Sequence, residues 1–372
     1  MAVSVDETES TYELPTGATL PSLAGLPQVA GTAPADEQVL DAEYFDTADL
    51  RLLRAGVTLR RRNGGSDAGW HLKLPAGPDG PAGPAIRREV RLPLAREGDP
   101  VPHELASQVR VHTRGEPLRP VARITTRRQL VRLLGHSGES LAEVAADDVS
   151  AQTMGESTTV SRWREAEVEL TAGGPALLAA AGRELRRAGL RPAGQAIKLQ
   201  RALGLQLDGP AHRPAPGPSS SAGEVVQAYL TGQAVTLKSL DPMVRRDEPD
   251  SVHQMRVATR RLRGTLRSFR QVIRQEDTAE LAASLQWLGR LLGGARDGEV
   301  LAGRLLAELR RTPAELLLGP VEARVQGHFA AAAAGARSEL LAALDSPRYF
   351  ALLDELDRLV ADPPLDPRAG EP

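Results

Sequence analysis

The hydrophobic positions change their period part-way along the chain. Up to about residue 208 they form short runs in which apolar and polar residues alternate, and Gly, Pro or Asp separates one run from the next. Alternation at every second residue is typical of strands with one buried face. We therefore predict one helix, from about Pro175 to Ala188, and strands at Val57–Arg62, Trp70–Leu74, Arg87–Leu92, Val121–Arg128 and Arg164–Leu170.

The second part of the chain has a helical period. Residues 209–221 show no period and are rich in Pro, Ser and Gly, as interdomain linkers are. Beyond them the apolar spacing predicts helices over about 223–240, 251–275, 278–293, 297–311, 318–344 and 347–360. A chain of 372 residues exceeds one typical core. The pattern therefore predicts an α+β protein with a β-rich domain over 1–208 and an all-α bundle over 222–372.

Composition excludes several classes of protein. The formal net charge is −2, which gives no support for a basic nucleic-acid binder. There is no Cys, so disulfides and thiol chemistry are excluded. No apolar run approaches the roughly 18 residues of a membrane span, and the acidic N-terminus lacks the basic and apolar parts of a secretory signal. We expect a cytoplasmic protein that does not enter a membrane.

One predicted helix carries a row of arginines. His253, Arg256, Arg260, Arg263, Arg267 and Arg270 recur every three or four residues, with Met255, Ala258, Leu262, Leu266, Phe269 and Ile273 opposite them. Between Ser251 and Arg274 there are seven Arg and no acid. A solvated helix face normally mixes both charges, because like charges four residues apart repel. The row therefore favours a chain of phosphates as partner. A nucleic acid is disfavoured, because Phe269 is expected on the apolar face and no other aromatic could stack bases.

This helix carries a family resemblance. The stretch HQMRVATRRLRGTLRSF, with LDPMVRRDEPDSV before it and WLGRLLGGARDGEVL after it, resembles the CHAD domain, a helical module that binds polyphosphate. The resemblance implies ligand contacts from His253, Arg256, Arg260, Arg261 and Arg263, with Arg296 and Asp297 near the same surface. The family has two helical halves, each with its own His and Arg helix. A second such motif is not found, since His328 precedes an Ala run, so we expect this domain to be incomplete.

The strands of the first domain place many charges on one face. Thr58, Arg60 and Arg62 share a face, as do His71 and Lys73, Arg123 and Arg127, and Glu165, Glu167 and Glu169. Such a face could lie in water. It could also line a closed barrel in which Arg and Lys bind phosphates while carboxylates hold Mg²⁺ or Mn²⁺.

The order of these strands resembles the CYTH domain, the fold of triphosphate tunnel metalloenzymes. YFDTADLRLLRAGVTLRRR is followed by WHLKLP, RREVRLPL, ARITTRR and EAEVEL. The family includes class IV adenylate cyclases, thiamine triphosphatases and inorganic triphosphatases, and CYTH followed by CHAD is a familiar pairing. The resemblance implies an antiparallel β tunnel barrel. With the sheet face it assigns phosphate binding to Arg60, Arg62, Arg91, Arg123 and Arg127, catalysis to Glu7, Glu9, Lys73 and Lys198, and metal binding to Glu7, Glu9, Asp148, Glu167 and Glu169.

The family motif Glu-x-Glu-x-Lys is altered here, because Thr11 follows Glu7 and Glu9 where the family has Lys. That Lys helps to orient or activate water in hydrolytic members, and Thr supplies neither a charge nor an amine. Asp147 and Asp148 are both candidates for one acidic position, and Asp148 is preferred. We predict binding of inorganic polyphosphate or triphosphate with weak or absent hydrolysis. The alternative is a metal-dependent inorganic tripolyphosphatase.

Overall fold

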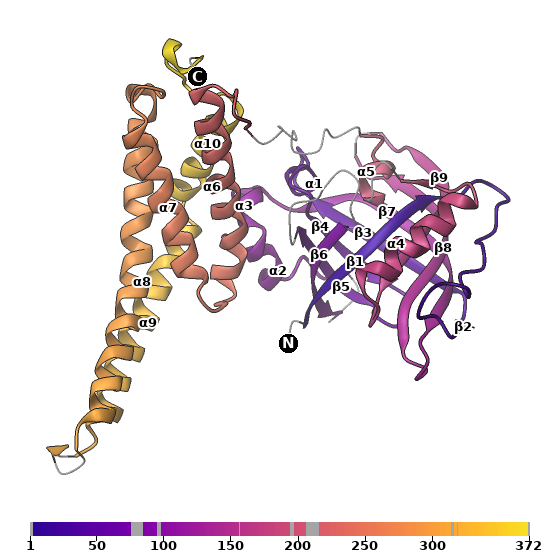
Figure 1. Cartoon of the computed structure of the whole chain (residues 1–372), viewed down its shortest axis with the longest axis horizontal. Helices are drawn as coiled ribbons and strands as arrows, with labels where there is room; N and C mark the ends of the chain where they lie inside the picture. Colours follow the sequence, from indigo (N-terminus) through magenta and orange to yellow (C-terminus); the bar gives the residue numbers. More distant parts are fainter. Residues whose placement is uncertain are drawn as a thin grey trace. The chain divides into compact units, whose positions relative to one another are not determined.

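The structure is a computed structural model (Figure 1). It describes residues 3–75, 85–94, 98–155, 157–193, 197–205, 216–313, 316–317 and 319–370, without the side chains of 3, 85, 295–300 and 368. The chain divides into two compact units. Met1–Leu105 and Glu116–Pro210 form the first, and Ala106–Gly115 and Ala211–Pro372 form the second. The sequence did not predict that residues 106–115 group with the helical unit. Of the predicted linker, residues 209–215 lie outside the described residues.

The first unit is a closed antiparallel barrel of eight strands, which confirms the antiparallel barrel implied by the family resemblance. Its order is β1-β6-β5-β4-β3-β7-β8-β9, and β9 pairs back with β1 (Figure 1). A barrel of this size leaves an interior for side chains or one small ligand. The strands are β1 (Val3–Glu13), β3 (Gln38–Asp46), β4 (Thr58–Asn63), β5 (Gly69–Pro75), β6 (Ala85–Pro93), β7 (Arg119–Leu134), β8 (Ser140–Thr153) and β9 (Val160–Leu170). The short strands β2 (Gly31–Pro34) and β10 (Arg191–Pro192) pair with β7 and β1.

Strand β1 closes the barrel by changing partner along its length. Its first half pairs with β6 and its second half with β9. Glu9 lies at the change, opposite both Ala85 and Glu169. The carboxylate-bearing middle of β1 is therefore paired on both sides.

Alternation on each strand separates an apolar outer layer from a charged interior. On β5, Trp70, Leu72 and Leu74 are buried on the outer face, whereas His71 and Lys73 lie on the inner one. Helix α4 (Pro175–Arg187) packs against β1 and β9, where it completes an outer apolar core. Helix α5 (Lys198–Ala202) packs against β7 and β8, and this brings Lys198 to the cavity.

The acidic residue of the YFDTADLRLL motif has a structural role. The buried carboxylate of Asp46 accepts hydrogen bonds from the backbone N–H groups of Thr47, Leu52 and Leu53 at 2.7–2.9 Å. These bonds fix the turn into α1 (Arg51–Arg54). Asp46 thereby sets the connection from β3 to the arginine-bearing strand β4.

The second unit is helical. It contains α6 (Ala222–Arg245), α7 (Ser251–Ser268), α8 (Ala279–Arg311), α9 (Val321–Leu344), α10 (Pro347–Ala361) and the short α3 (Arg110–Thr113), which follows α2 (His103–Gln108). Leucines of α6, α7, α8 and α10 form its core, together with Tyr349. A capping box between Ser221 and Glu224 starts α6. Within the described residues, no helix is both long and apolar enough to cross a membrane.

Two predictions about these helices are wrong. Helix α7 ends at Ser268, so Phe269 is a C-cap residue and its side chain is 45% exposed. The helices predicted over 278–293 and 297–311 are one continuous helix, α8. The glycines at 293 and 294 suggested a break. The helix continues because α8 packs against both α7 and α9, and tertiary packing outweighs intrinsic propensity.

Candidate functional site: a charged tunnel in the barrel

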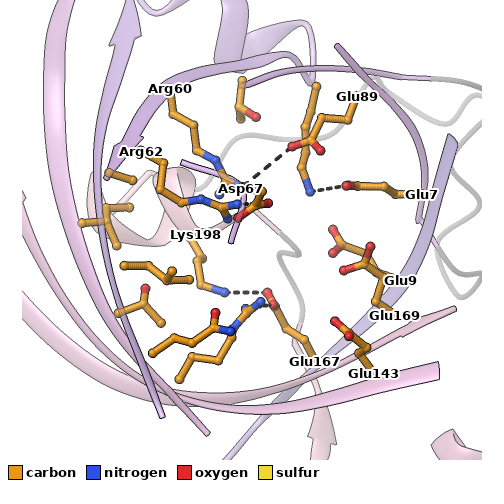
Figure 2. A pocket seen from close by; sticks show the side chains of 18 of the residues that line it. Glu7, Glu9, Arg60, Arg62, Asp67, Glu89, Glu143, Glu167, Glu169 and Lys198 are labelled. Atoms are coloured by element: carbon orange, nitrogen blue, oxygen red, sulfur yellow. Dashed lines mark hydrogen bonds and ion pairs between the residues drawn. The ribbon is translucent and has the colours of Figure 1, made fainter. Parts of the chain in front are cut away.

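The barrel encloses a polar cavity of about 280 Å³. Inner-face side chains of every barrel strand, with Ile197 and Lys198 beside α5, line it (Figure 2). Its basic residues are Arg60, Arg62, Lys73, Arg87, Arg91, Arg128, Arg132 and Lys198, and its acidic residues are Glu7, Glu9, Asp67, Glu89, Glu143, Glu167 and Glu169. The cavity is therefore built to hold a ligand with many charges.

Strands β4 and β6 supply one basic region. Arg62 pairs with Asp67, and Arg91 lies 3.9 Å from the same carboxylate. An Arg60 nitrogen is 3.8 Å from Glu89, and the two guanidinium groups of β4 point into the cavity (Figure 2). These planar, permanently charged groups match the geometry of phosphate oxygens.

Glu89 is the buried hub of this region. Its carboxylate accepts a hydrogen bond from Arg91 and lies 2.9 Å from His71 Nδ1. Burial raises the pKa of Glu89, but His71, Lys73 and Arg60 outweigh burial and hold the pKa well below its usual range. Glu89 thus stays ionised and keeps the surrounding basic groups in place.

A second basic region lies across the cavity on β7 and α5. Arg128 donates to Asp147 at 2.6 and 2.8 Å and also pairs with Glu167. The Lys198 ammonium lies 2.5 Å from Glu167 and 3.0 Å from Asp147 and also contacts Glu165. Burial lowers the pKa of Lys198, but these three carboxylates hold it well above its usual range. Lys198 is therefore a fixed cation.

Among the described residues, the cavity also holds two carboxylates without a direct ion pair, beside Glu143, which pairs with Arg132 at 3.3 Å. Glu9, Glu169 and Glu143 lie side by side on β1, β9 and β8, and Figure 2 shows their carboxylates converging. Within the described residues, neither Glu9 nor Glu169 has a hydrogen bond or salt bridge. Burial and the nearby charge of Glu7 raise the pKa of Glu169 to about 7. Bringing like charges together in this way is unfavourable unless a cation joins them.

The carboxylates of Glu9 and Glu169 could hold a divalent cation, because Mg²⁺ and Mn²⁺ prefer carboxylate ligands. Glu7 and Glu143 lie beside them but already pair with Lys73 and Arg91 and with Arg132. A tighter cluster exists in the described residues, because oxygens of Asp147, Glu165 and Glu167 lie within 4.8 Å of one another. Lys198 and Arg128 already neutralise that cluster. The group around Glu169 is therefore the better candidate for a metal site.

The basic surface of α7 has the predicted two-sided form. Met255, Ala258, Leu262 and Leu266 are buried in the helical core. Arg260, Arg261, Arg263 and Arg267 are exposed, whereas His253 and Arg256 are half-buried. The Arg256 guanidinium lies over Gly293 of α8. The side chains of Arg296 and Asp297, also expected near this surface, lie outside the described residues.

Comparison with known proteins identifies both units. The CYTH domain model matches residues 7–199 and the CHAD domain model matches residues 228–372. Two uncharacterized proteins of Mycobacterium tuberculosis, MT2285 and Rv2226, are 41% identical over 370 residues, covering 96% of this chain and 70% of each relative. The chain belongs to the CYTH–CHAD family.

Solved structures similar to this CYTH–CHAD chain include PptA from Streptomyces chartreusis, with 25% identity and a TM-score of 0.37, covering 41% of this chain and 53% of that one. Another, from Hippeastrum, is described as a putative adenylyl cyclase with a dominant triphosphatase activity. It is 15% identical with a TM-score of 0.34, and the match covers 55% of this chain and 99% of that one.

Some residues assigned to the CYTH–CHAD tunnel from sequence do not line it. Arg123 and Arg127 are 59% and 65% exposed and pair with Asp41 and Glu37, so their expected inward position is wrong. Arg128 and Arg132 lie on the other face of β7 and line the cavity instead. The choice of Asp148 is also wrong, because Asp148 is 56% exposed and pairs with Arg164.

The remaining predicted residues come together in the cavity. Glu7, Glu9, Arg60, Arg62, Lys73, Arg91, Glu167, Glu169 and Lys198 all line it. Asp147 is buried beside Lys198. The sequence prediction considered Asp147 but did not prefer it, and it missed Arg87, Glu89, Arg128, Arg132 and Glu143. A signal for some of them is period-two alternation with a residue already assigned inward, since Glu89 and Arg87 lie two and four positions before Arg91 on β6.

Thr11 occupies the altered motif position on β1. It lies opposite Glu167, the carboxylate that Lys198 contacts, and its hydroxyl is buried without a hydrogen-bond partner. The position is therefore next to Lys198, but it adds no cation of its own.

Proposed function

We propose that this chain binds inorganic polyphosphate or a triphosphate in the tunnel, together with Mg²⁺ or Mn²⁺, and hydrolyses it weakly or not at all. The observation that supports this most directly is the composition of the cavity wall. Two basic regions, around Arg60 and around Arg128, share one enclosed space with the carboxylates of Glu9 and Glu169, which have no ion pair among the described residues. A polyanion with a divalent cation satisfies both sets of charges.

The chain's own residues would bind and orient the phosphates. Arg60 and Arg62 line the cavity from β4 (Figure 2), and Arg128 lines it from β7. Charge-assisted hydrogen bonds from guanidinium groups to phosphate are about twice as strong as neutral ones. Phosphate oxygens would take the place of Asp67 and Glu89 as partners of these groups. A bound divalent cation would neutralise phosphate charge, and Glu9 and Glu169 would hold it.

Weak hydrolysis follows from the proton chemistry at Thr11. Its hydroxyl cannot accept a proton from water near neutral pH or supply a positive charge. The two lysines of the cavity do not replace the family's motif Lys. Lys198 is held as an ammonium by three carboxylates. Burial lowers the pKa of Lys73, but Glu9 and Glu7 outweigh burial and raise it.

A second candidate, a metal-dependent tripolyphosphatase, has its own supporting observation. The cavity brings together Glu7, Glu9, Arg60, Arg62, Lys73, Glu167 and Glu169. The arginines could hold the phosphates for in-line attack by water, and the carboxylates could hold the divalent cation that assists it.

Phosphate release separates the two candidates. The full chain would be incubated with tripolyphosphate and Mg²⁺ or Mn²⁺, with EDTA as the blank, while binding is measured by calorimetry. Binding without turnover supports the first candidate, and robust turnover supports the second. Absence of binding would overturn both. Arg60→Met should weaken binding, whereas the matched variant Arg61→Met should not, because Arg61 pairs with Glu43 away from the cavity.

For the second unit we propose that the exposed arginines of α7 bind polyphosphate. Four exposed guanidinium groups over two turns can follow a phosphate chain. Because Phe269 is 45% exposed beside Arg270, the absence of an exposed aromatic no longer argues against a nucleic acid. Competition between polyphosphate and single-stranded DNA tests this point. Displacement of polyphosphate by DNA at equal phosphate concentration would contradict the proposed preference.

A further inference from the structure

Arg87 is a buried cation that the assignments above leave without a role. It lies on β6, where Arg87, Glu89 and Arg91 face the cavity at alternate positions. Its side chain is 7% exposed, and its Cα lies opposite Glu7 on β1 and Pro75 on β5. Arg87 therefore lines the tunnel at the end of β6 opposite to Arg91.

Unlike the other lining cations, Arg87 has no partner in the described part of the chain. The paired ones are Arg60 with Glu89, Arg62 with Asp67, Lys73 with Glu7, Arg91 with Glu7 and Glu89, Arg128 and Lys198 with Asp147 and Glu167, and Arg132 with Glu143. Among the described residues, no hydrogen bond or ion pair involves the Arg87 guanidinium, and its Nε is buried without a partner.

Glu7, the carboxylate opposite Arg87 on the neighbouring strand, already pairs with other cations. Glu7 Oε2 lies 2.5 Å from Lys73, and Glu7 Oε1 accepts a hydrogen bond from Arg91 at 2.8 Å. A buried charge without a partner is strongly unfavourable. A negatively charged ligand that pairs with the Arg87 guanidinium would explain why an arginine is present at this position.

The position of Arg87 along the strand defines a separate subsite. Arg91 lies four positions after Arg87 on the strand, which is about 13 Å at about 3.3 Å per residue. Arg91 shares Asp67 with Arg62 and so belongs to the first basic region. We propose that Arg87 is a phosphate-binding residue at a second subsite, which makes the tunnel favour a phosphate chain long enough to reach both over a short phosphate. This inference rests on the proposed binding of phosphates in the tunnel.

Chain-length dependence of binding tests the subsite. Diphosphate, tripolyphosphate and a medium-chain polyphosphate would be titrated into the full chain with Mg²⁺. The background would carry Arg260→Glu and Arg263→Glu, which remove competing charge on α7. Arg87→Met is expected to weaken binding of the longest chain by about tenfold or more, and that of diphosphate by less than about twofold. Arg87→Lys should recover part of the loss, because it keeps the charge but not the fork of donors.

Arg88→Met is the matched control, since Arg88 is the adjacent residue and its side chain pairs with Asp6 at 3.1 Å away from the cavity. Without ligand, Arg87→Met should unfold at a temperature no lower than the parent, whereas a structural arginine would lower it. If the parent binds no phosphate, the proposed function itself fails. The subsite is refuted if the parent binds phosphates and Arg87→Met binds all three ligands as tightly as the parent does. It is also refuted if Arg87→Met loses as much affinity for diphosphate as for the longest chain.

Discussion

Glu169→Gln is expected to stabilise the metal-free barrel above pH 7 and to remove its stabilisation by Mg²⁺ or Mn²⁺. Burial and repulsion from Glu7 raise the pKa of Glu169 to about 7. At about 1.4 kcal/mol per pH unit, ionising this carboxyl in the folded state costs about 3 kcal/mol. Glutamine has nearly the same shape and no charge, so it avoids this cost.

The sign of the pH dependence follows from the raised pKa. The folded state binds the proton more tightly than the unfolded state, so the penalty is fully present above pH 7 and fades as the pH falls toward the ordinary range of Glu. Burial also raises the pKa of Glu7, so Glu7 acts in the same direction. The pKa values of Glu89 and Glu167 are lowered, so the stability that these ionised carboxylates contribute is lost only at lower pH. His71 and His112 act in the opposite direction, because burial lowers their pKa values, but they do so equally in both proteins. In EDTA, the advantage of Glu169→Gln over wild type should therefore shrink between about pH 8 and pH 5.

Urea unfolding measures this difference. The barrel contains Trp70 and Trp163, so its unfolding can be followed by fluorescence. In EDTA at about pH 8, Glu169→Gln should gain up to about 3 kcal/mol, and the exposed control Glu13→Gln should be unchanged. A cation at a hundred times its Kd should stabilise wild type by about 2.7 kcal/mol and the variant much less. Equal stability of the two metal-free proteins, or equal stabilisation by the cation, would refute the assignment.

Three further predictions concern other charged groups. Thr11→Lys should raise tripolyphosphate hydrolysis by about a hundredfold, the low end for general acid–base catalysis; unchanged phosphate release would show that Thr11 is not what limits turnover. Arg260→Glu with Arg263→Glu should weaken polyphosphate retention by at least about tenfold without shifting unfolding. The equally exposed pair Arg304→Glu with Arg324→Glu is its control, and equal losses in the two would contradict a specific α7 surface. Lys198→Met should cost about 3–5 kcal/mol in urea unfolding, because three buried carboxylates lose a cation; a loss below about 1 kcal/mol would contradict its structural role.

Local pattern was enough to predict a β-rich part, a helical part and the charged face of some strands. On β5, apolar Trp70, Leu72 and Leu74 alternate with polar His71 and Lys73, so the two faces are distinct. This alternation also fits a sheet with one face in water, so the prediction of a closed barrel came from the family resemblance in the order of the motifs. The closed barrel and the helical second unit are confirmed.

The errors occur where neighbouring residues are chemically alike. Arg127 and Arg128 are adjacent on β7, and Asp147 and Asp148 are adjacent on β8, so alternation alone gives no choice within either pair. The choice is made by strand pairing and barrel closure: Arg128 lies opposite Asp147, which lies opposite Glu165 on β9. A shift of one residue would turn all these side chains outward. That information depends on contacts between distant residues.

The two-sided pairing of β1 has a consequence for how occupancy of the tunnel could be detected. Glu9 cannot move toward a ligand by fraying of an edge, because the backbone beside it is hydrogen bonded to β6 on one side and to β9 on the other. Local opening there requires separation of a strand from the barrel, which is a large and rare event. Filling the tunnel should therefore slow amide hydrogen exchange around much of the cylinder rather than in a single loop.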